Sequence, residues 1–501
     1  MSNELRSKTI RAMGHLGLGS AMGKVMSLGT TLILARILSP ADYGLIAIAM
    51  IVIGFIGFFN EVGIGSAIVQ KTELTTTEVN GCFVIALMVS SVLVCLTVAS
   101  SGLIADFYEH PQLKKMISVL ASGFIFGAFS TVPMAFLRKD MQFKAIAGVN
   151  ILATLIQSIV SLVLALLGYG VWSLVWGFVT ASIVTSTGFF LLSSWRPRGA
   201  YGIREASNLV IYGLHVTSTR IFWYLYTNAD KAIVGKMLGA KSLGIYDMAF
   251  SLATLPSAQI TTLVINVASP LFSKLQKNLA ELSSVMLQLT RGVAYVTYPM
   301  LIGMLVCGHE LIMVLLGPDW IDVLIPFRAL CLMGLIKSVD PLLSQVLTST
   351  GNAKKLSAYT AMCSVVMLLG VVVGAMLDGL RGVSIVWVLI YPLLSVKLLR
   401  DVSAVIGMPM LAYYRTLLPV LSGTVAMGAV VLAVRELTIS SIPSVHALLA
   451  LEIVSGVISY FFWIVYLDKK GLAQIRQTLI DLGISETRLN RWPFIRHTEP
   501  T

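Results

Sequence analysis

The sequence predicts an all-α, polytopic membrane protein with fourteen transmembrane helices, arranged as two pseudo-symmetric six-helix lobes plus two C-terminal helices. Three observations predict this class: the composition, the number of long apolar segments, and an internal repeat. Hydrophobic residues make up 56% of the 501 residues and charged residues only 12%, whereas a soluble domain has roughly 25% charged residues. Such a chain cannot cover its surface with charge, so we expect it to lie in a lipid bilayer.

A membrane-spanning helix needs about 20 mostly apolar residues. Fourteen segments meet that requirement: 13–37, 43–65, 80–105, 114–136, 145–168, 171–193, 209–238, 243–267, 286–307, 322–347, 356–377, 381–399, 412–434 and 444–467. The first six and the second six are predicted to form the two lobes, and the last two are an addition.

The repeat is carried by residues 33–50 and 233–250, which are identical at four equivalent positions: Ile33/Ile233, Leu38/Leu238, Gly44/Gly244 and Ala49/Ala249. A second pair, Gly170-Val171 and Gly382-Val383, keeps nearly the same spacing, which indicates a duplicated bundle. The predicted divisions are an N-lobe (1–193), a connector (194–208), a C-lobe (209–400), additional helices (401–467) and a basic, amphipathic tail (468–501).

Lysine and arginine are more frequent in alternate loops, beginning with the N-terminal segment. Because cytoplasmic loops carry the excess of basic residues, we expect both termini, the connector and the tail in the cytoplasm. Six spans per lobe is an even number, so the repeats enter the membrane in the same direction and are expected to face each other across a central cavity. Trp195 and Trp320 are predicted to belong to the aromatic belts at the membrane interfaces.

Several classes of function are excluded by what the sequence contains. The five cysteines all fall in apolar segments, which does not suit a disulfide framework. The net charge of +12 is spread over short loops, which does not suit nucleic-acid binding. No metal-ligand or nucleophile motif occurs, so we expect no enzyme activity, no metal and no cofactor.

Several motifs resemble one transporter family: FYEHPQL (107–113), LRKDMQFK (137–144), GYGVWSLV (168–175), WRPRG (195–199), NADKAIVGKMLGAKSLGIYDMA (228–249) and LGPDW (316–320). They are similar to the polysaccharide-transporter branch of the multidrug/oligosaccharidyl-lipid/polysaccharide exporter superfamily. Within it they resemble Wzx-type flippases of exopolysaccharide and colanic-acid-like clusters.

The resemblance implies a multi-pass protein of the bacterial inner membrane. It further implies movement of an undecaprenyl-diphosphate-linked oligosaccharide to the periplasmic leaflet. The implied partners are that lipid, the membrane lipids, and a polymerase and chain-length regulator of the pathway. We expect a monomer that binds no nucleic acid.

A diphosphate head crossing the bilayer needs a wet cavity lined by cations, so charges inside the spans are the candidate ligands. Lys24 lies near the centre of the first span, and Arg220 lies on its repeat counterpart. Lys337 is a third candidate, but the interpretation that its spacing favours is a salt bridge with Asp340 one turn away, with a substrate contact as the alternative. Each of the first two can instead be a structural cation, paired with a neighbouring helix or with backbone carbonyls.

Asp230, Asp247 and Glu61 are candidates for coupling transport to protons or sodium. Two aspartates on adjacent helices can titrate or hold a cation. The structural alternative pairs Asp230 with Lys231 and lets Asp247 cap an outer loop. Glu61 can also pair with a nearby lysine. Glu452, inside the last span, is expected to pair locally or to meet a partner.

Two other functions compete with the flippase. A multidrug or cation antiporter of the same superfamily would need an acidic first-lobe cavity, whereas these spans offer a central Lys24 and only Glu61 near a helix end. A membrane glycosyltransferase, polymerase or ligase would need a sizeable outer loop with catalytic groups, and the outer loops are short.

Overall fold

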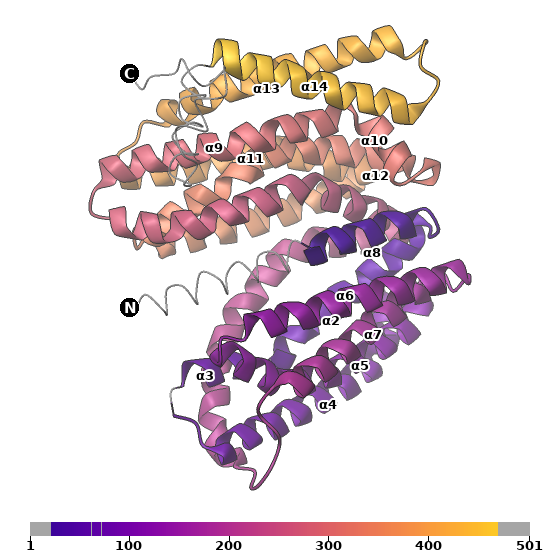
Figure 1. Cartoon of the computed structure of the whole chain (residues 1–501), viewed down its shortest axis with the longest axis vertical. Helices are drawn as coiled ribbons and strands as arrows, with labels where there is room; N and C mark the ends of the chain where they lie inside the picture. The colour runs from indigo at the N-terminus through magenta and orange to yellow at the C-terminus, as the bar shows by residue number, and fades with distance from the viewer. Residues whose placement is uncertain (1–21, 62, 72, 469–501) are drawn as a thin grey trace. The chain divides into compact units, whose positions relative to one another are not determined.

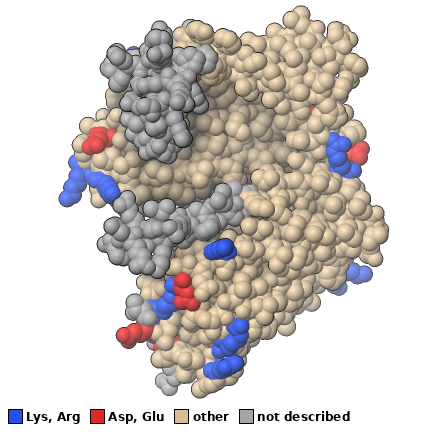
Figure 2. All heavy atoms as spheres, viewed as in Figure 1, with Lys and Arg blue, Asp and Glu red and all other residues tan. Residues whose placement is uncertain are grey.

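The computed structural model describes residues 22–61, 63–71 and 73–468, with the side chains of residues 204–226 described only in part. These residues form helices and no strand (Figure 1). Ten of the described helices are long and apolar enough to cross a membrane. Figure 2 shows few charged side chains on a mostly uncharged face. The chain is therefore an all-helical, multi-pass membrane protein.

The first compact unit comprises Met1–Gly244. It contains the helical segment Met22–Ala35, α2 (Pro40–Glu61), α3 (Ile64–Gln70), α4 (Thr76–Phe107), α5 (Gln112–Lys139), α6 (Phe143–Leu166), α7 (Trp172–Leu192) and the first part of α8 (Ile203–Leu275). Helix α5 is central, because it packs against α2, α3, α4 and α7, while α6 packs mainly on α7 (Figure 1).

Two helices are much longer than a bilayer is thick. Helix α8 has 73 residues and α12 (Ala353–Ile406) has 54, whereas about 20 residues span the roughly 30 Å hydrocarbon core. Each is interrupted by non-helical backbone, α8 at Gly239 (φ 83°) and α12 at Asp378 and Gly379 (φ 53°). These breaks fall at the predicted boundaries between spans, so each long helix provides two of the predicted segments.

The fourteen crossings stay a prediction, and the structure adds details that the hydropathy pattern lacks. Helix α2 ends at Glu61 and α3 follows Gly63, whose φ of 62° stops the helix within the second predicted span. Two short elements, α10 (Gly308–Leu315) and η1 (Pro318–Val323), precede α11 (Leu324–Ser349). Helix α11 carries three charged residues and is not among the ten apolar helices.

In the first unit, loops that follow even-numbered predicted spans contact each other, and loops near the ends of odd-numbered spans contact each other. The Lys139 Nζ donates a hydrogen bond to the Lys71 carbonyl at 2.9 Å, which joins the loops after the second and fourth predicted spans. The Lys236 Nζ lies 2.8 Å from a Glu109 carboxylate oxygen, joining the loops near the ends of the third and seventh. The hydrogen bond from Lys236 and its positive charge lower the pKa of Glu109. This grouping is what successive up-and-down crossings produce.

The repeated stretches exchange contacts in a reciprocal way. A Cβ atom on Gly44 would overlap the carbonyl oxygen of Ala240, and a Cβ on Gly244 would overlap that of Pro40. Pro40 and Ala240 are themselves equivalent positions, 200 residues apart like the two glycines. Such an exchange is what a local two-fold axis generates, and it needs glycine at both places because backbone meets backbone.

The connector after α7 is packed against α4 and α5. Trp195 is 7% exposed, with its ring 5.1 Å from that of Phe83 and 6.5 Å from that of Phe136. The Asn80 side chain donates a hydrogen bond to the Arg198 carbonyl at 2.6 Å. The prediction of an interfacial-belt residue was wrong for Trp195, because the ring fills a protein core between helix ends.

Trp195→Ala should lower the stability of the first unit. Truncating a buried aromatic side chain costs about 3–5 kcal/mol through lost burial and the cavity left behind. The measurement is thermal unfolding of the purified protein in detergent, with Trp176→Ala as the control, since Trp176 on α7 is 44% exposed. An equal shift for both variants would contradict a packing role for the connector.

The second unit comprises Ile245–Thr501. Its helices are the rest of α8, α9 (Leu279–Val306), α10, α11, α12, α13 (Met410–Thr438) and α14 (Val445–Leu467), with η1 after α10. Helix α11 packs between α9 and α12, and α13 packs on both α9 and α14. Trp320 in η1 is fully buried, so the belt prediction was wrong for it too.

A buried ion pair joins the end of α14 to α9. The Arg291 guanidinium lies 2.7 and 2.8 Å from the two carboxylate oxygens of Asp468. The Tyr295 hydroxyl also bonds to Asp468. Asp468 directly follows α14, so these contacts fix that end of the additional helices to the rest of the unit.

Candidate functional site

The second unit presents the ammonium of Lys337 to two aromatic rings. Its Nζ lies 4.8 Å from the ring centre of Phe250 on α8 and 5.1 Å from that of Trp387 on α12. Lys337 itself is on α11, so three helices build the site. An ammonium held over aromatic faces remains a compact cation with donors for an anion.

The aromatic residues are fixed by one another. The Trp387 indole N–H donates to the Tyr246 hydroxyl at 2.7 Å. The rings of Tyr246 and Phe250 are 6.1 Å apart, and those of Trp387 and Tyr391 are 5.8 Å apart. Each of these ring pairs is spaced i, i+4 on one helix, so both members lie on the same face. The result is an aromatic wall from α8 and α12 beside Lys337.

Asp340 lies one helical turn after Lys337 and is 5% exposed. One carboxylate oxygen accepts a hydrogen bond from the Tyr391 hydroxyl at 3.0 Å, and the other accepts one from Ser395 at 2.8 Å. Two hydroxyl donors thus satisfy a buried carboxylate. Tyr391 belongs to both the aromatic wall and this carboxylate site, which connects the two.

In the first unit, Lys24 is exposed on the segment Met22–Ala35. That segment runs along α6: the Thr30 hydroxyl donates to the Ser158 hydroxyl at 2.7 Å, and a Cβ on Gly23 would touch the Thr154 hydroxyl at 3.9 Å. The segment that carries Lys24 therefore packs at ordinary contact distance against a polar face of α6.

A cavity of about 280 Å³ lies between α5, α6 and α7. Its lining includes Gly127 and Ser130 from α5, Gln157 from α6, and Ser182 and Thr185 from α7. Gln157 is one turn from Thr154 and next to Ser158, so the polar stripe of α6 continues from the Lys24 segment to this cavity. Phe126 and Phe178 also line it, so the cavity combines hydroxyl and amide groups with apolar walls.

The predicted site residues are distributed over the two units. Lys24 and Asp230 belong to the first, and Lys337 and Asp247 to the second. Asp230 and Asp247 are both partly buried. The side chains of Arg220 and Glu61 lie outside the described part of the structure. The roles assigned to these residues in substrate binding and ion coupling stay predictions, as does the salt bridge between Lys337 and Asp340.

Sequence reasoning missed the aromatic partners of Lys337. The available signal was the i, i+4 spacing of Tyr246/Phe250 and Trp387/Tyr391, because such pairs mark one helix face. It also missed Glu310 and Arg435, which meet Glu452 in the second unit. Glu310 precedes an apolar stretch shorter than a span, where a carboxylate looks like an ordinary loop residue.

Comparisons with known proteins agree with this architecture. The family described as "Polysaccharide biosynthesis protein" matches residues 33–325, more than half of the chain. The lipopolysaccharide biosynthesis protein WzxC of Escherichia coli (strain K12) is 23% identical over 388 residues, covering 77% of this chain and 79% of WzxC. The teichuronic acid biosynthesis protein TuaB of Bacillus subtilis (strain 168) is 23% identical over 433 residues, covering 84% and 87%.

Two solved structures share the fold. The lipid II flippase MurJ, in an inward closed conformation, superposes with a TM-score of 0.74 at 15% identity, covering 89% of this chain and 97% of MurJ. An inward-facing multidrug resistance MATE family transporter of the MOP superfamily gives a TM-score of 0.60 at 16% identity, covering 76% and 95%. The chain therefore belongs to the polysaccharide biosynthesis protein family and has the fold of MOP superfamily transporters.

Proposed function

We propose that the protein is a flippase that carries an undecaprenyl-diphosphate-linked oligosaccharide from the cytoplasmic to the periplasmic leaflet, for export of an exopolysaccharide or O-antigen-like polymer. In this proposal it works by alternating access in the bacterial inner membrane, with both termini in the cytoplasm. The named relatives act in polysaccharide biosynthesis, and MurJ is a lipid flippase.

The observation that carries the proposal is the presentation of Lys337 on an aromatic wall within a membrane helix bundle. A charged residue inside a membrane helix bundle is costly unless it faces protein or a cavity, so it marks a functional site by default. An ammonium is suited to a diphosphate, which it binds as a point charge without a fixed orientation. The head can then move past it while the lipid tail stays in the bilayer.

In this proposal Lys24 and Arg220 are two further cations that bind the diphosphate, as Lys337 does. Both lie on segments related by the repeat, so a diphosphate moving between them would meet a cation on each side. The polar stripe of α6 beside the Lys24 segment supports a hydrated path there. Asp230, Asp247 and Glu61 remain the candidates for proton or sodium coupling.

The second candidate is an ion-coupled multidrug or cation antiporter, which the shared fold with the MATE transporter allows. Organic cations need an anionic or purely aromatic site. The aromatic wall instead already holds an ammonium at 4.8 and 5.1 Å, which favours an anionic substrate.

Lys24→Ala and Arg220→Ala should each abolish polymer export while the amount of protein in the membrane stays unchanged. The measurement is surface polymer in cells whose own copy is deleted, with membrane levels followed by immunoblotting. Lys144→Ala, which removes an exposed lysine in the first turn of α6, is the matched control and should export normally. Full export by the double variant would remove both residues from the proposed site.

Alternating access has a separate test. A cysteine placed beside Lys24 should change its reactivity toward a membrane-impermeant thiol reagent when lipid-linked substrate is supplied. Unchanged labelling with and without substrate would argue against a cavity that opens to alternate sides.

A further inference from the structure

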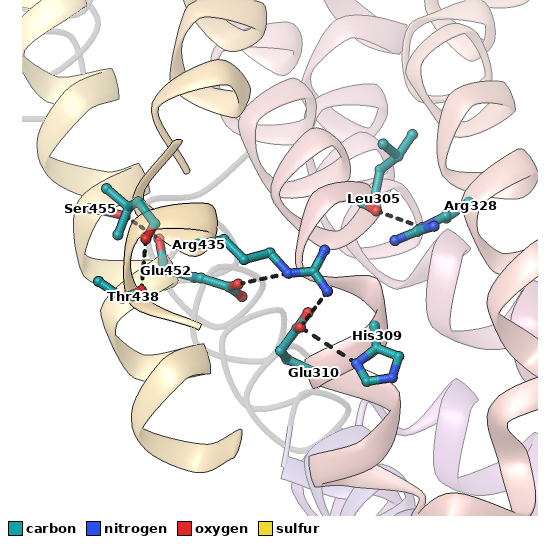
Figure 3. Close-up of polar contacts among 9 residues, drawn as sticks. Leu305, His309, Glu310, Arg328, Arg435, Thr438, Glu452 and Ser455 are labelled. Atoms are coloured by element: carbon teal, nitrogen blue, oxygen red, sulfur yellow. Dashed lines mark hydrogen bonds and ion pairs between the residues drawn. The ribbon is translucent and has the colours of Figure 1, made fainter. Parts of the chain in front are cut away.

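The second unit holds two buried glutamates around one arginine, where α10, α13 and α14 meet (Figure 3). Arg435 Nη2 on α13 lies 2.7 Å from Oε1 of Glu310 on α10. Its Nε lies 3.8 Å from Oε1 of Glu452 on α14. The Glu310 side chain is 3% exposed and that of Glu452 is 0% exposed. This triad is separate from Lys337 and from every residue considered for ion coupling above.

The carboxylate of Glu452 has no strong hydrogen-bond donor among the described residues. Neither oxygen of Glu452 accepts a bond from an N–H or O–H group of the described residues. The nearby Ser455 hydroxyl donates to the backbone carbonyl of Glu452 instead, at 2.9 Å. The thiol of Cys307, at the end of α9, is the neighbour that reaches the carboxyl. A buried ionised carboxylate is normally surrounded by donors, so this environment suits the neutral acid.

The charge balance points the same way. One guanidinium can neutralise one carboxylate, and Arg435 is closer to Glu310 than to Glu452. With His309 neutral, two ionised glutamates would leave a net negative charge in a site buried within the helix bundle, which is strongly unfavourable. A metal cation is disfavoured by Arg435, and the described residues hold no group of three or more metal-ligating side chains suited to an ion. A proton on Glu452 removes the imbalance.

His309 provides the connection to water. Its Nδ1 lies 3.5 Å from Glu310 Oε1, and its side chain is 42% exposed. The titratable and charged groups around Glu452 are Glu310 and His309 from α10, Arg435 from α13 and Cys307 at the end of α9. Arg328, drawn nearby in Figure 3, donates to the Leu305 carbonyl at 3.2 Å. Histidine exchanges protons readily near neutral pH.

We propose that Glu452 is a proton-binding site, held neutral beside the Glu310–Arg435 ion pair, and that its proton passes to the Glu310 carboxylate, then to His309 and from there to solvent. The site joins the additional helices α13 and α14 to α10, so loss of the proton would place two negative charges at that junction. The proposal is independent of which substrate the protein carries.

The test uses dicyclohexylcarbodiimide, an apolar reagent that modifies protonated carboxyl groups. The full-length protein in lipid nanodiscs is treated over a pH series, and the modified residues are located by mass spectrometry. An exposed glutamate is ionised at pH 7, so Glu452 should react at least about tenfold more than exposed Glu436 on α13. The extent of Glu452 modification should fall at alkaline pH. After a jump to alkaline pH, this fall should be slower in His309→Gln than in the unsubstituted protein.

Two outcomes would overturn the proposal: Glu452 reacting no more than Glu436 at neutral pH, or Glu310 reacting in its place. A second measurement covers the case in which variants fold poorly. The infrared carbonyl band of protonated carboxylic acids should be present at neutral pH in the unsubstituted protein and should lose the intensity of one carboxyl group in Glu452→Gln. Persistence of the whole band in a folded Glu452→Gln protein would show that the proton resides elsewhere.

Discussion

Gly244→Ala is expected to reduce polymer export at least about fivefold, because its Cβ would collide with the Pro40 carbonyl across the reciprocal contact. The colliding atoms are backbone, so no side chain can move aside. Overpacking costs about 1–3 kcal/mol. A bias of that size shifts a two-state equilibrium by roughly 5- to 150-fold, away from the state in which residues 40–44 and 240–244 touch. Export in the deletion strain measures the loss.

The reciprocal contact supplies a partner test and a control. Gly44→Ala should have the same effect, because its Cβ would overlap the Ala240 carbonyl. Gly102→Ala on α4 is the control, since a Cβ there meets nothing within 4 Å. In that helix it should be neutral or slightly stabilising. Normal export by both Gly44→Ala and Gly244→Ala would mean that the contact is not required during transport.

Lys337→Met should abolish export while leaving the protein in the membrane. Methionine keeps the length and apolar stem of the side chain, so the packing against Phe250 and Trp387 is largely retained while the charge is lost. If the ammonium binds a diphosphate, a bond to a charged group worth about 1.5–3 kcal/mol disappears, together with its long-range attraction. The measurements are surface polymer and the level of the variant in membranes.

Two further variants separate a binding role from a structural one. Lys337→Arg keeps the charge and should restore part of the export, whereas Trp387→Leu keeps the lysine but removes one ring of its support. Lys355→Met, at an exposed position near the start of α12, is the matched control and should export normally. Full export by Lys337→Met would exclude Lys337 from the substrate path.

The hydropathy pattern predicted which segments form helices, because the free energy of placing a helix in lipid depends mainly on how apolar that segment is. It also separated the two parts of α12, since Asp378 and Gly379 interrupt an otherwise apolar stretch. It did not show that α2 ends before Gly63 or that α10 and η1 form separate elements. Those boundaries depend on the left-handed backbone of Gly63 and on the packing of Trp320, and neither changes how apolar the surrounding segment is.

The candidate site was predicted only in part. A lysine inside a span is unusual enough to be noticed, so Lys337 was identified from the sequence. Its partners Phe250 and Trp387 come from distant helices, and hydropathy cannot tell which helix faces meet. Glu452 was noticed for the same reason as Lys337. Its relation to Glu310 and Arg435 required the packing of α10 and α13 against α14.

The ion pair between Arg291 and Asp468 determines how far the chain can be shortened from its C-terminal end. Truncation after Leu467 would leave a buried guanidinium without its carboxylate, a change that typically costs about 3–5 kcal/mol. Truncation just beyond Asp468 would keep both that pair and the Tyr295 contact. Shortened versions for crystallisation, and fusions to a reporter protein, should therefore retain Asp468.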